Sequence, residues 1–153
     1  MVTHPSGLKV LIIDDEPMIR QVVRRMLEDK GYETEIADIA GKAIEMIQNH
    51  YFDVIPVDVR MSGMNGNEFY HQVREMNKQL ATRIIFVTGD VLNTKTTEFI
   101  ENNNVLLLAK PFSQDKLYDA INHAMQRCHY TTDIEVSTTN QEINFSEQYT
   151  RSV

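Results

Sequence analysis

Five short strand-like runs, four of them apolar and one alternating, are separated by amphipathic segments along most of the chain. The runs span residues 8–14, 32–37, 52–61, 83–88 and 105–109, and the second of them is the alternating one. Between them, hydrophobic residues recur at helical spacing, which predicts helices near 17–30, 40–50, 67–78, 94–101 and 113–128. Parallel strands joined by right-handed helical crossovers are the economical solution for this order. The sequence therefore predicts an α/β fold: a five-stranded parallel, doubly wound sheet with five helices on its two faces.

Length and charge favour one soluble domain and exclude some partners. The chain has 153 residues, a formal net charge of −7 and a pI of about 5.2. This acidity disfavours direct binding to nucleic acid or to an anionic membrane, because both need a basic face. No apolar run has the length of a membrane span, and the N-terminus lacks a signal-peptide pattern. The single cysteine, Cys128, fits a reducing compartment, so we expect a cytoplasmic location.

The composition changes near the C-terminus, where the helical pattern gives way to Thr, Ser, Asn and Gln. We expect the domain to cover residues 8–128 and a polar tail or linker to cover residues 129–153. Two short alternating stretches, 134–136 and 143–145, leave a weak hairpin or a docking peptide as the alternative for this segment.

Acidic, hydroxyl and lysine side chains stand at the ends of four apolar runs. They are Asp14, Asp15 and Glu16 after the first run, Asp58 in the third, Thr88 in the fourth and Lys110 after the fifth. Open α/β sheets bind ligands at the carboxyl ends of their strands, so we expect these side chains to meet. Clustered carboxylates need a cation, and Mg²⁺ prefers oxygen ligands. A carboxylate can also be the nucleophile of phosphoryl transfer. Each residue alone is more often structural, and only their combination indicates a site.

The order and spacing of five motifs resemble the receiver domains of two-component response regulators. The motifs are Ile13-Asp14-Asp15-Glu16-Pro17, Val57-Asp58-Val59-Arg60-Met61, Gly63-Met64-Asn65-Gly66, Val87-Thr88-Gly89 and Lys110-Pro111-Phe112. The resemblance covers residues 8–128 and implies the flavodoxin-like strand order 2-1-3-4-5. The stretch from Gly89 to Leu92 and the helix after it look most like receivers appended to hybrid sensor histidine kinases. A stand-alone receiver is the alternative.

The resemblance implies a phosphoryl acceptor, a metal site and a class of partner. Asp58 would take the phosphoryl group from a histidine kinase or a phosphotransfer protein. Mg²⁺ would be held by Asp15, Asp58 and the backbone carbonyl of Arg60, with Asp14 acting through water. The oligomeric state is left open. Whether the chain counts as an enzyme is also open, since an isolated receiver catalyses only its own phosphorylation and dephosphorylation.

Two further residues would meet the phosphoryl group. Lys110 would pair with it, and Thr88 would close onto it and report phosphorylation to the surface of the fourth helix, fifth strand and fifth helix. Three positions depart from the family pattern. Pro56 lies inside the central strand, where its missing N–H favours a bulge or an irregular ladder. Ser62 replaces a common proline, and Leu107 replaces the aromatic residue of many receivers, so only Thr88 is left of the usual switch pair.

Three other classes of protein share parts of this pattern. A phosphatase of the haloacid dehalogenase type also uses an aspartate nucleophile at a strand end, but Arg60 stands where its second aspartate is expected. A pseudo-receiver that only binds partners would lack the acid pair, the acceptor or the lysine, and all are present. An FMN carrier of the flavodoxin type needs a Ser/Thr-rich phosphate loop after the first strand, where the acidic run 14–16 would repel a phosphate.

Arg60 and Asp90 lie two residues beyond Asp58 and Thr88. In the receiver fold these positions flank the mouth of the site, where attacking water enters. Their opposite charges favour an ion pair across that mouth, although Arg60 could instead sit on the phosphoryl group and speed hydrolysis. We expect the ion pair, and therefore slow loss of the phosphoryl group.

Overall fold

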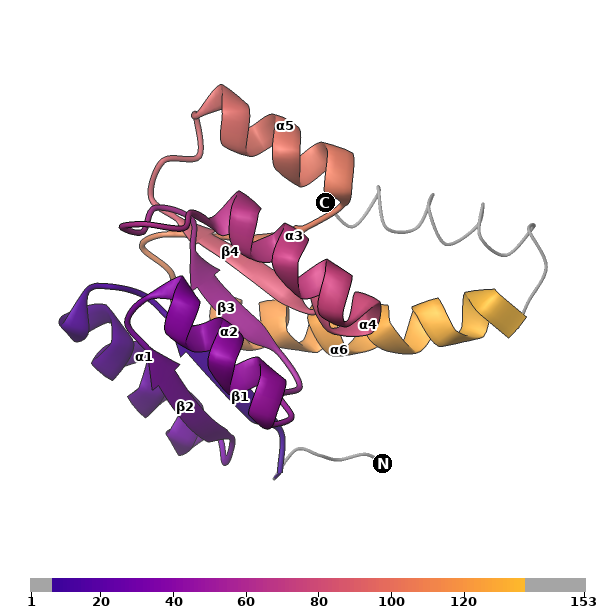
Figure 1. Cartoon of the computed structure of the whole chain (residues 1–153). Helices are drawn as coiled ribbons and strands as arrows, with labels where there is room; N and C mark the ends of the chain where they lie inside the picture. Colours follow the sequence, from indigo (N-terminus) through magenta and orange to yellow (C-terminus); the bar gives the residue numbers. More distant parts are fainter. Residues whose placement is uncertain (1–6, 137–153) are drawn as a thin grey trace.

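The computed structural model describes residues 7–136, with only the backbone from residue 128 onward (Figure 1). Its strands are β1 Lys9–Ile13, β2 Glu33–Ala37, β3 Ile55–Asp58, β4 Ile84–Thr88 and β5 Leu106–Ala109. They form one parallel sheet in the order β2-β1-β3-β4-β5. This result confirms the predicted sheet and its strand order.

Within residues 7–136, six helices connect and cover the strands, where the sequence predicted five. They are α1 Pro17–Asp29, α2 Ala40–Asn49, α3 Gly66–Met76, α4 Lys78–Ala81, α5 Thr94–Asn103 and α6 Gln114–Val136. The additional helix, α4, is a short segment directly after α3. It forms because Asn77 ends α3 and caps α4, its side chain accepting from the N–H of Leu80. None of the helices between residues 7 and 136 is long and apolar enough to cross a membrane.

The last helix, α6, extends beyond the predicted end of the domain. Ser113 caps it, because the hydroxyl of Ser113 accepts from the N–H of Lys116 at 3.2 Å. The helix then continues to Val136, through the first residues of the predicted tail. Residues 134–136 are therefore helical rather than part of a hairpin, and residues 143–145 lie outside the described residues. The domain boundary at residue 128 stays a prediction.

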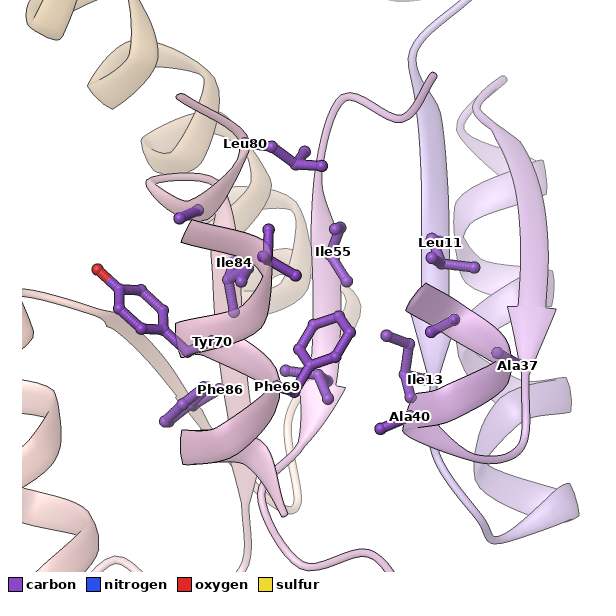
Figure 2. Close-up of a cluster of buried hydrophobic side chains, with 14 of the residues drawn as sticks. Leu11, Ile13, Ala37, Ala40, Ile55, Phe69, Tyr70, Leu80, Ile84 and Phe86 are labelled. Atoms are coloured by element: carbon purple, nitrogen blue, oxygen red, sulfur yellow. The ribbon is translucent and has the colours of Figure 1, made fainter. Parts of the chain in front are cut away.

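The sheet separates two hydrophobic clusters. The first contains Phe69 and Phe86 and lies under α2, α3 and α5, whereas the second contains Leu27 and Leu117 and lies under α1 and α6. Figure 2 shows the first cluster, in which Phe69 extends from α3 toward β3. Every residue of β3 and β4 is buried. This burial on both faces explains why these strands are continuous apolar runs in the sequence rather than alternating ones.

Pro56 interrupts one ladder without shifting its register. β3 pairs with β4 along its whole length. Its pairing with β1 is reduced to a bridge between Val10 and Val54 and a pair between Ile13 and Val57. Both pairs have the same offset, so no residue is inserted and the expected alternative of a bulge does not form. The predicted irregular ladder is present on the β1 side, because proline has no N–H to donate.

Candidate functional site

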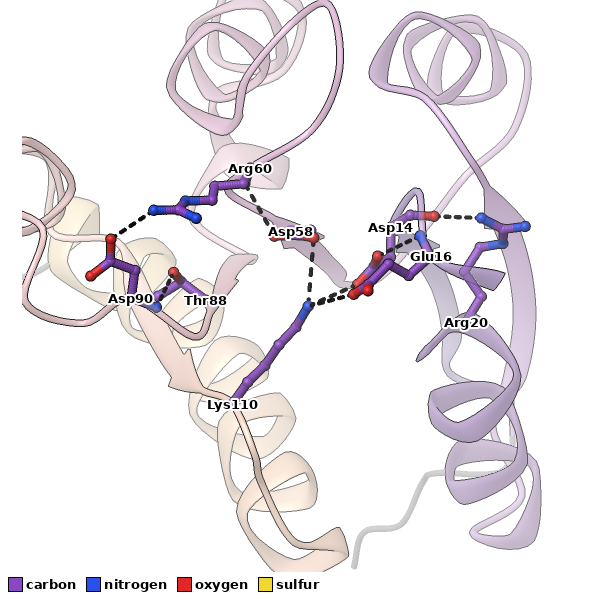
Figure 3. A network of polar contacts seen from close by, with 8 residues as sticks. All are labelled: Asp14, Glu16, Arg20, Asp58, Arg60, Thr88, Asp90 and Lys110. Carbon is purple, nitrogen blue, oxygen red and sulfur yellow. Dashed lines mark hydrogen bonds and ion pairs between the residues drawn. The ribbon is translucent and has the colours of Figure 1, made fainter. Parts of the chain in front are cut away.

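Four predicted site residues stand at the carboxyl end of the sheet (Figure 3). Asp14 follows β1, Asp58 ends β3, Thr88 ends β4 and Lys110 follows β5. Asp14, Asp58 and Thr88 are buried, with exposed fractions of 3%, 7% and 3%. Since β1 and β4 flank β3, the strand order places Asp58 between the acidic run and the hydroxyl of Thr88.

The ammonium group of Lys110 lies among three carboxylates. Its Nζ is 3.3 Å from Asp14 Oδ2, 3.5 Å from Asp58 Oδ2 and 3.7 Å from Glu16 Oε1. Burial acts to lower the pKa of Lys110, but attraction to Asp58, Asp14 and Glu16 outweighs burial, and the pKa is raised. Lys110 therefore stays protonated and supplies a fixed positive charge beside Asp58.

Burial is the largest influence on Asp58 and raises the pKa of its carboxyl group. Repulsion from Asp14 raises this pKa further. The N–H of Arg60, which donates to Asp58 Oδ1 at 3.1 Å, and the ammonium of Lys110 act in the opposite direction without reversing the shift. The negative charge of Asp58 is thus incompletely compensated, which favours the binding of a further cation.

Three carboxylates are close enough to share a metal ion. Ligand atoms of Asp14, Glu16 and Asp58 all lie within 4.8 Å of one another. This all-oxygen set suits Mg²⁺, which takes a few carboxylates and completes its shell with water or phosphate. Asp15, the predicted direct ligand, is exposed and lies outside this group, so its role stays a prediction. Glu16 belongs to the group although it was not predicted as a ligand, and its only sequence signal is its place in the acidic run.

Asp14 is fixed in place by its own neighbours. Its Oδ1 accepts from the N–H of Glu16 at 2.9 Å, and its carbonyl oxygen accepts from Arg20 Nη1 at 2.7 Å. Pro17 starts α1 immediately afterwards, where its missing N–H costs nothing. The short turn from β1 into α1 therefore holds the Asp14 carboxylate in the site.

Arg60 and Asp90 form the ion pair predicted at the mouth of the site. Arg60 Nη2 donates to Asp90 Oδ2 at 2.8 Å (Figure 3). Their side chains are 69% and 38% exposed. The backbone N–H of Asp90 also donates to Thr88 Oγ1, at 3.0 Å. The loops that follow β3 and β4 are therefore tied together next to Asp58.

Leu107 leaves the β5 edge of the sheet without an aromatic ring. It pairs with Phe86 in the register of β4 and β5, and it is 42% exposed. Its side chain is thus available to solvent, and it makes no ring contact of the kind that a tyrosine or phenylalanine could make at this position.

A comparison with protein-family models identifies the chain. The model described as "Response regulator receiver domain" matches residues 10–122. The chain belongs to this family. The match begins in β1 and ends in α6, so it includes every residue of the site. Receivers act in phosphorylation-dependent two-component signalling with histidine kinases or phosphotransfer partners, and they bind Mg²⁺ at their acidic pocket. The predicted family and the predicted general function are thereby confirmed.

Several curated proteins are similar to this receiver over most of its length. The C4-dicarboxylate transport transcriptional regulatory protein DctD of Pseudomonas aeruginosa is 30% identical over 118 residues, which are 77% of this chain and 25% of DctD. Response regulator Rre1 of Synechocystis is 25% identical over 82% of this chain and 55% of its own. Sensor protein EvgS of Escherichia coli is 28% identical over 84% of this chain and 10% of its own. The receiver therefore spans about half of Rre1 and smaller parts of the other two.

Solved structures show the same fold. Chemotaxis protein CheY4 of Vibrio cholerae has a TM-score of 0.70 and 33% identity, over 77% of this chain and 98% of that chain. A receiver domain protein of Methanospirillum hungatei has a TM-score of 0.75 and 26% identity, over 82% and 99%. TrrA of Thermotoga maritima, solved in complex with Mg²⁺–BeF, has a TM-score of 0.67 and 24% identity, over 76% and 98%.

Proposed function

We propose that Asp58 accepts a phosphoryl group from a histidine kinase or a phosphotransfer protein. The observation that carries this proposal is the surroundings of Asp58. Its buried carboxylate ends the central strand, lies 3.5 Å from Lys110 Nζ, and shares a metal-sized cluster with Asp14 and Glu16. A nucleophile, a fixed cation and a set of oxygen ligands therefore occupy one small site, which is what transfer to a carboxylate requires.

In the transfer, a carboxylate oxygen of Asp58 forms a bond to phosphorus as the phosphorus–nitrogen bond of a phosphohistidine breaks. The electron pair of the broken bond returns to the imidazole of the donor. Asp58 must be ionised for this step. Burial raises the pKa of Asp58, whereas Lys110 lowers it and any bound cation would also favour the ionised carboxylate. The phosphoryl oxygens then need partners of positive charge or hydrogen-bond donors.

Mg²⁺ fits the acidic side of the site. It would be held by Asp15, Asp58 and the backbone carbonyl of Arg60, with Asp14 acting through water. Glu16 lies close enough to Asp14 and Asp58 to offer a further oxygen. When bound, the ion supplies positive charge that stabilises the phosphoryl oxygens.

Lys110 and Thr88 complete the set of partners. Lys110 already lies beside Asp58, so it can pair with a phosphoryl oxygen after a small movement of its side chain. Thr88 Oγ1 accepts one hydrogen bond from Asp90, and its own proton is available to donate. Thr88 is therefore suited to sense whether Asp58 carries a phosphoryl group.

The rival enzyme function is disfavoured by Arg60. A phosphatase with an aspartate nucleophile needs a second carboxylate at this position to protonate the leaving group. Here the position carries a guanidinium that is paired with Asp90. A pseudo-receiver without chemistry is disfavoured by Asp58, Lys110 and Asp14, which are all present and assembled.

The relatives of this receiver indicate the kind of protein to which it belongs. Sensor protein EvgS and the regulatory protein DctD both contain a segment similar to it, within much longer chains. We favour an origin within a hybrid sensor kinase over a stand-alone receiver, and a cytoplasmic location in either case. No direct contact with nucleic acid or a membrane is proposed, because the net charge is −7.

The test is mass spectrometry after incubation with acetyl phosphate and Mg²⁺. We expect one added phosphoryl group in the parent and none in Asp58→Asn. Asp29→Asn makes the same chemical change at an exposed residue at the end of α1 and should be phosphorylated like the parent. An undiminished phosphoryl peak in Asp58→Asn would exclude Asp58 as the acceptor.

A further inference from the structure

A groove lies at the amino end of the sheet, opposite the phosphoryl site. It has a volume of about 430 Å³ and is bounded by the ends of α2 and α3, by α4 and by the segments that enter β3 and β4. Its lining includes the buried side chains of Phe52 and Leu80, and also Tyr51 and Met76, which are 65% and 39% exposed. This volume is within the range of ligand sites. Two large apolar side chains that are exposed in one groove indicate a surface for another group.

The charge of this groove differs from that of the phosphoryl site. Among the residues that the structure describes, those lining the groove include Arg83 and His50 but no aspartate or glutamate. Arg83 Nη1 donates to the hydroxyl of Tyr51 at 3.2 Å and lies 3.8 Å from Asp53 Oδ1. The carboxyl end of the sheet instead gathers the three carboxylates of the phosphoryl site. A segment that carries glutamates is therefore repelled at the carboxyl end and tolerated at the amino end.

The last helix brings the C-terminal part of the chain to this end of the sheet. α6 begins after β5 at the carboxyl end and packs against α4, which lines the groove (Figure 1). Arg127 of α6 is only 7% exposed, and the helix continues from there to Val136. This last part of α6 is about 14 Å long, a distance that about four or five extended residues cover. The chain from about residue 141 onward is therefore within reach of the groove.

Residues 142–149 have side chains that suit this groove. Their sequence is Glu142-Ile143-Asn144-Phe145-Ser146-Glu147-Gln148-Tyr149. Alternate residues of an extended chain share one face, so Ile143, Phe145 and Tyr149 would extend the same way. Glu147 is on that face too, and the groove offers it a guanidinium instead of the carboxylates of the phosphoryl site. The segment thus matches the groove in both its apolar and its acidic side chains.

We propose that residues 142–149, the docking segment, bind in this groove with Phe145 against Tyr51 and Met76. The burial of apolar side chains favours docking, whereas the ordering of the segment opposes it. Because the segment belongs to the same chain, its effective concentration at the groove is about millimolar, so weak contacts are sufficient. Docking covers the amino end of the sheet and leaves the phosphoryl site open. The interaction therefore does not depend on the proposed function of Asp58.

The experiment uses a fluorescent reporter in the full chain, which contains no tryptophan. Phe145→Trp introduces one indole within the docking segment, and Ser152→Trp introduces one outside it. We expect Phe145→Trp to emit at a shorter wavelength than Ser152→Trp and to be quenched less by acrylamide. Adding Met76→Ala to Phe145→Trp should lower the ratio of docked to free segment by about 2- to 12-fold, the range of one sulfur–aromatic contact. The emission should then shift toward that of Ser152→Trp.

Two further variants separate the groove from general effects on packing. Met18→Ala makes the same change as Met76→Ala at a residue of α1 that is 78% exposed, and it should leave the emission of Phe145→Trp unchanged. Tyr51→Ala alters the groove from the segment that enters β3. It should repeat the effect of Met76→Ala, which excludes a local effect on α3.

Three results would overturn the inference. One is that the indole of Phe145→Trp is quenched as readily as that of Ser152→Trp. Another is that Val22→Ala, in a second groove between α1 and the start of α6, releases the indole while Met76→Ala does not. The third is an emission that changes with protein concentration, because the segment would then dock on a second copy of the chain.

Discussion

Lys110 lies 3.5 Å from Asp58 but does not offset the cost of burying that carboxylate, because the pKa of Asp58 is still raised. The site therefore holds a charge that the metal-free protein would be more stable without. This conflict between stability and function is expected where a protein prepares a nucleophile for a cation and a phosphoryl group.

Asp58→Asn should accordingly stabilise the metal-free protein at neutral pH. Since the folded-state pKa is raised, the folded protein binds more protons than the unfolded chain between the unfolded pKa, near 3.8, and the folded one. The free energy of unfolding therefore falls as pH rises through that window, and the loss persists at pH 7. Thermal unfolding in EDTA should give Asp58→Asn a higher Tm than the parent at pH 7 and a smaller advantage at pH 3. A lower Tm at pH 7 would contradict the prediction.

Asp15→Ala should weaken Mg²⁺ binding, by roughly tenfold or more if Asp15 is a ligand. The same change removes one charge from the acidic run, so the metal-free variant should be no less stable than the parent. An NMR titration with Mg²⁺ measures the affinity, and Asp29→Ala is the control for loss of an exposed aspartate. If Asp15→Ala binds Mg²⁺ with unchanged affinity and Glu16→Gln binds it more weakly, Glu16 is the ligand and Asp15 is not.

The sequence predicts the sheet, and which side chains meet at its carboxyl edge, because both depend on local patterns. A strand that is buried on both faces needs a continuous run of apolar residues. A polar residue directly after such a run therefore lies at the carboxyl edge of the sheet. Asp14, Asp58, Thr88 and Lys110 are therefore placed by position alone. The pairing of Arg60 with Asp90 also follows, since each lies a fixed two residues beyond a strand end.

Other features depend on packing that no local pattern records. Asp15 and Glu16 are consecutive acids in the sequence, and only the geometry of the turn into α1 decides which carboxylate approaches Asp58. The packing of α5 through Phe99 and Ile100 is not apparent either, because two adjacent apolar residues among polar ones give no helical stripe. α6 runs past the predicted boundary through a polar segment that has no strong helical pattern.

Gly66 offers a test of the packing beneath the site. A Cβ added to Gly66 would lie 3.1 Å from the backbone Cα of Val59 and 3.6 Å from the ring of Phe86. Gly66→Ala should therefore destabilise the protein by about 1–3 kcal/mol. Gly41 in α2 has open space around it, so Gly41→Ala should stabilise the protein by about 0.4–1 kcal/mol. Urea unfolding compares the two, and equal effects would show that the contact with Val59 relaxes at little cost.

The ion pair between Arg60 and Asp90 should slow the loss of the phosphoryl group. The pair spans the mouth of the site with a 2.8 Å contact, and water has to pass it to reach a phosphorylated Asp58. Exposed pairs are worth about 0–1 kcal/mol, so breaking this one should speed hydrolysis by up to about fivefold. The decay of phosphorylated protein should be faster in Arg60→Ala and in Asp90→Ala. Arg24→Ala and Glu28→Ala break a similar exposed pair on α1 and should leave the decay unchanged. Slower decay in Arg60→Ala would instead mean that Arg60 stabilises the charge of the departing phosphoryl group, and unchanged decay in both variants would exclude the gate.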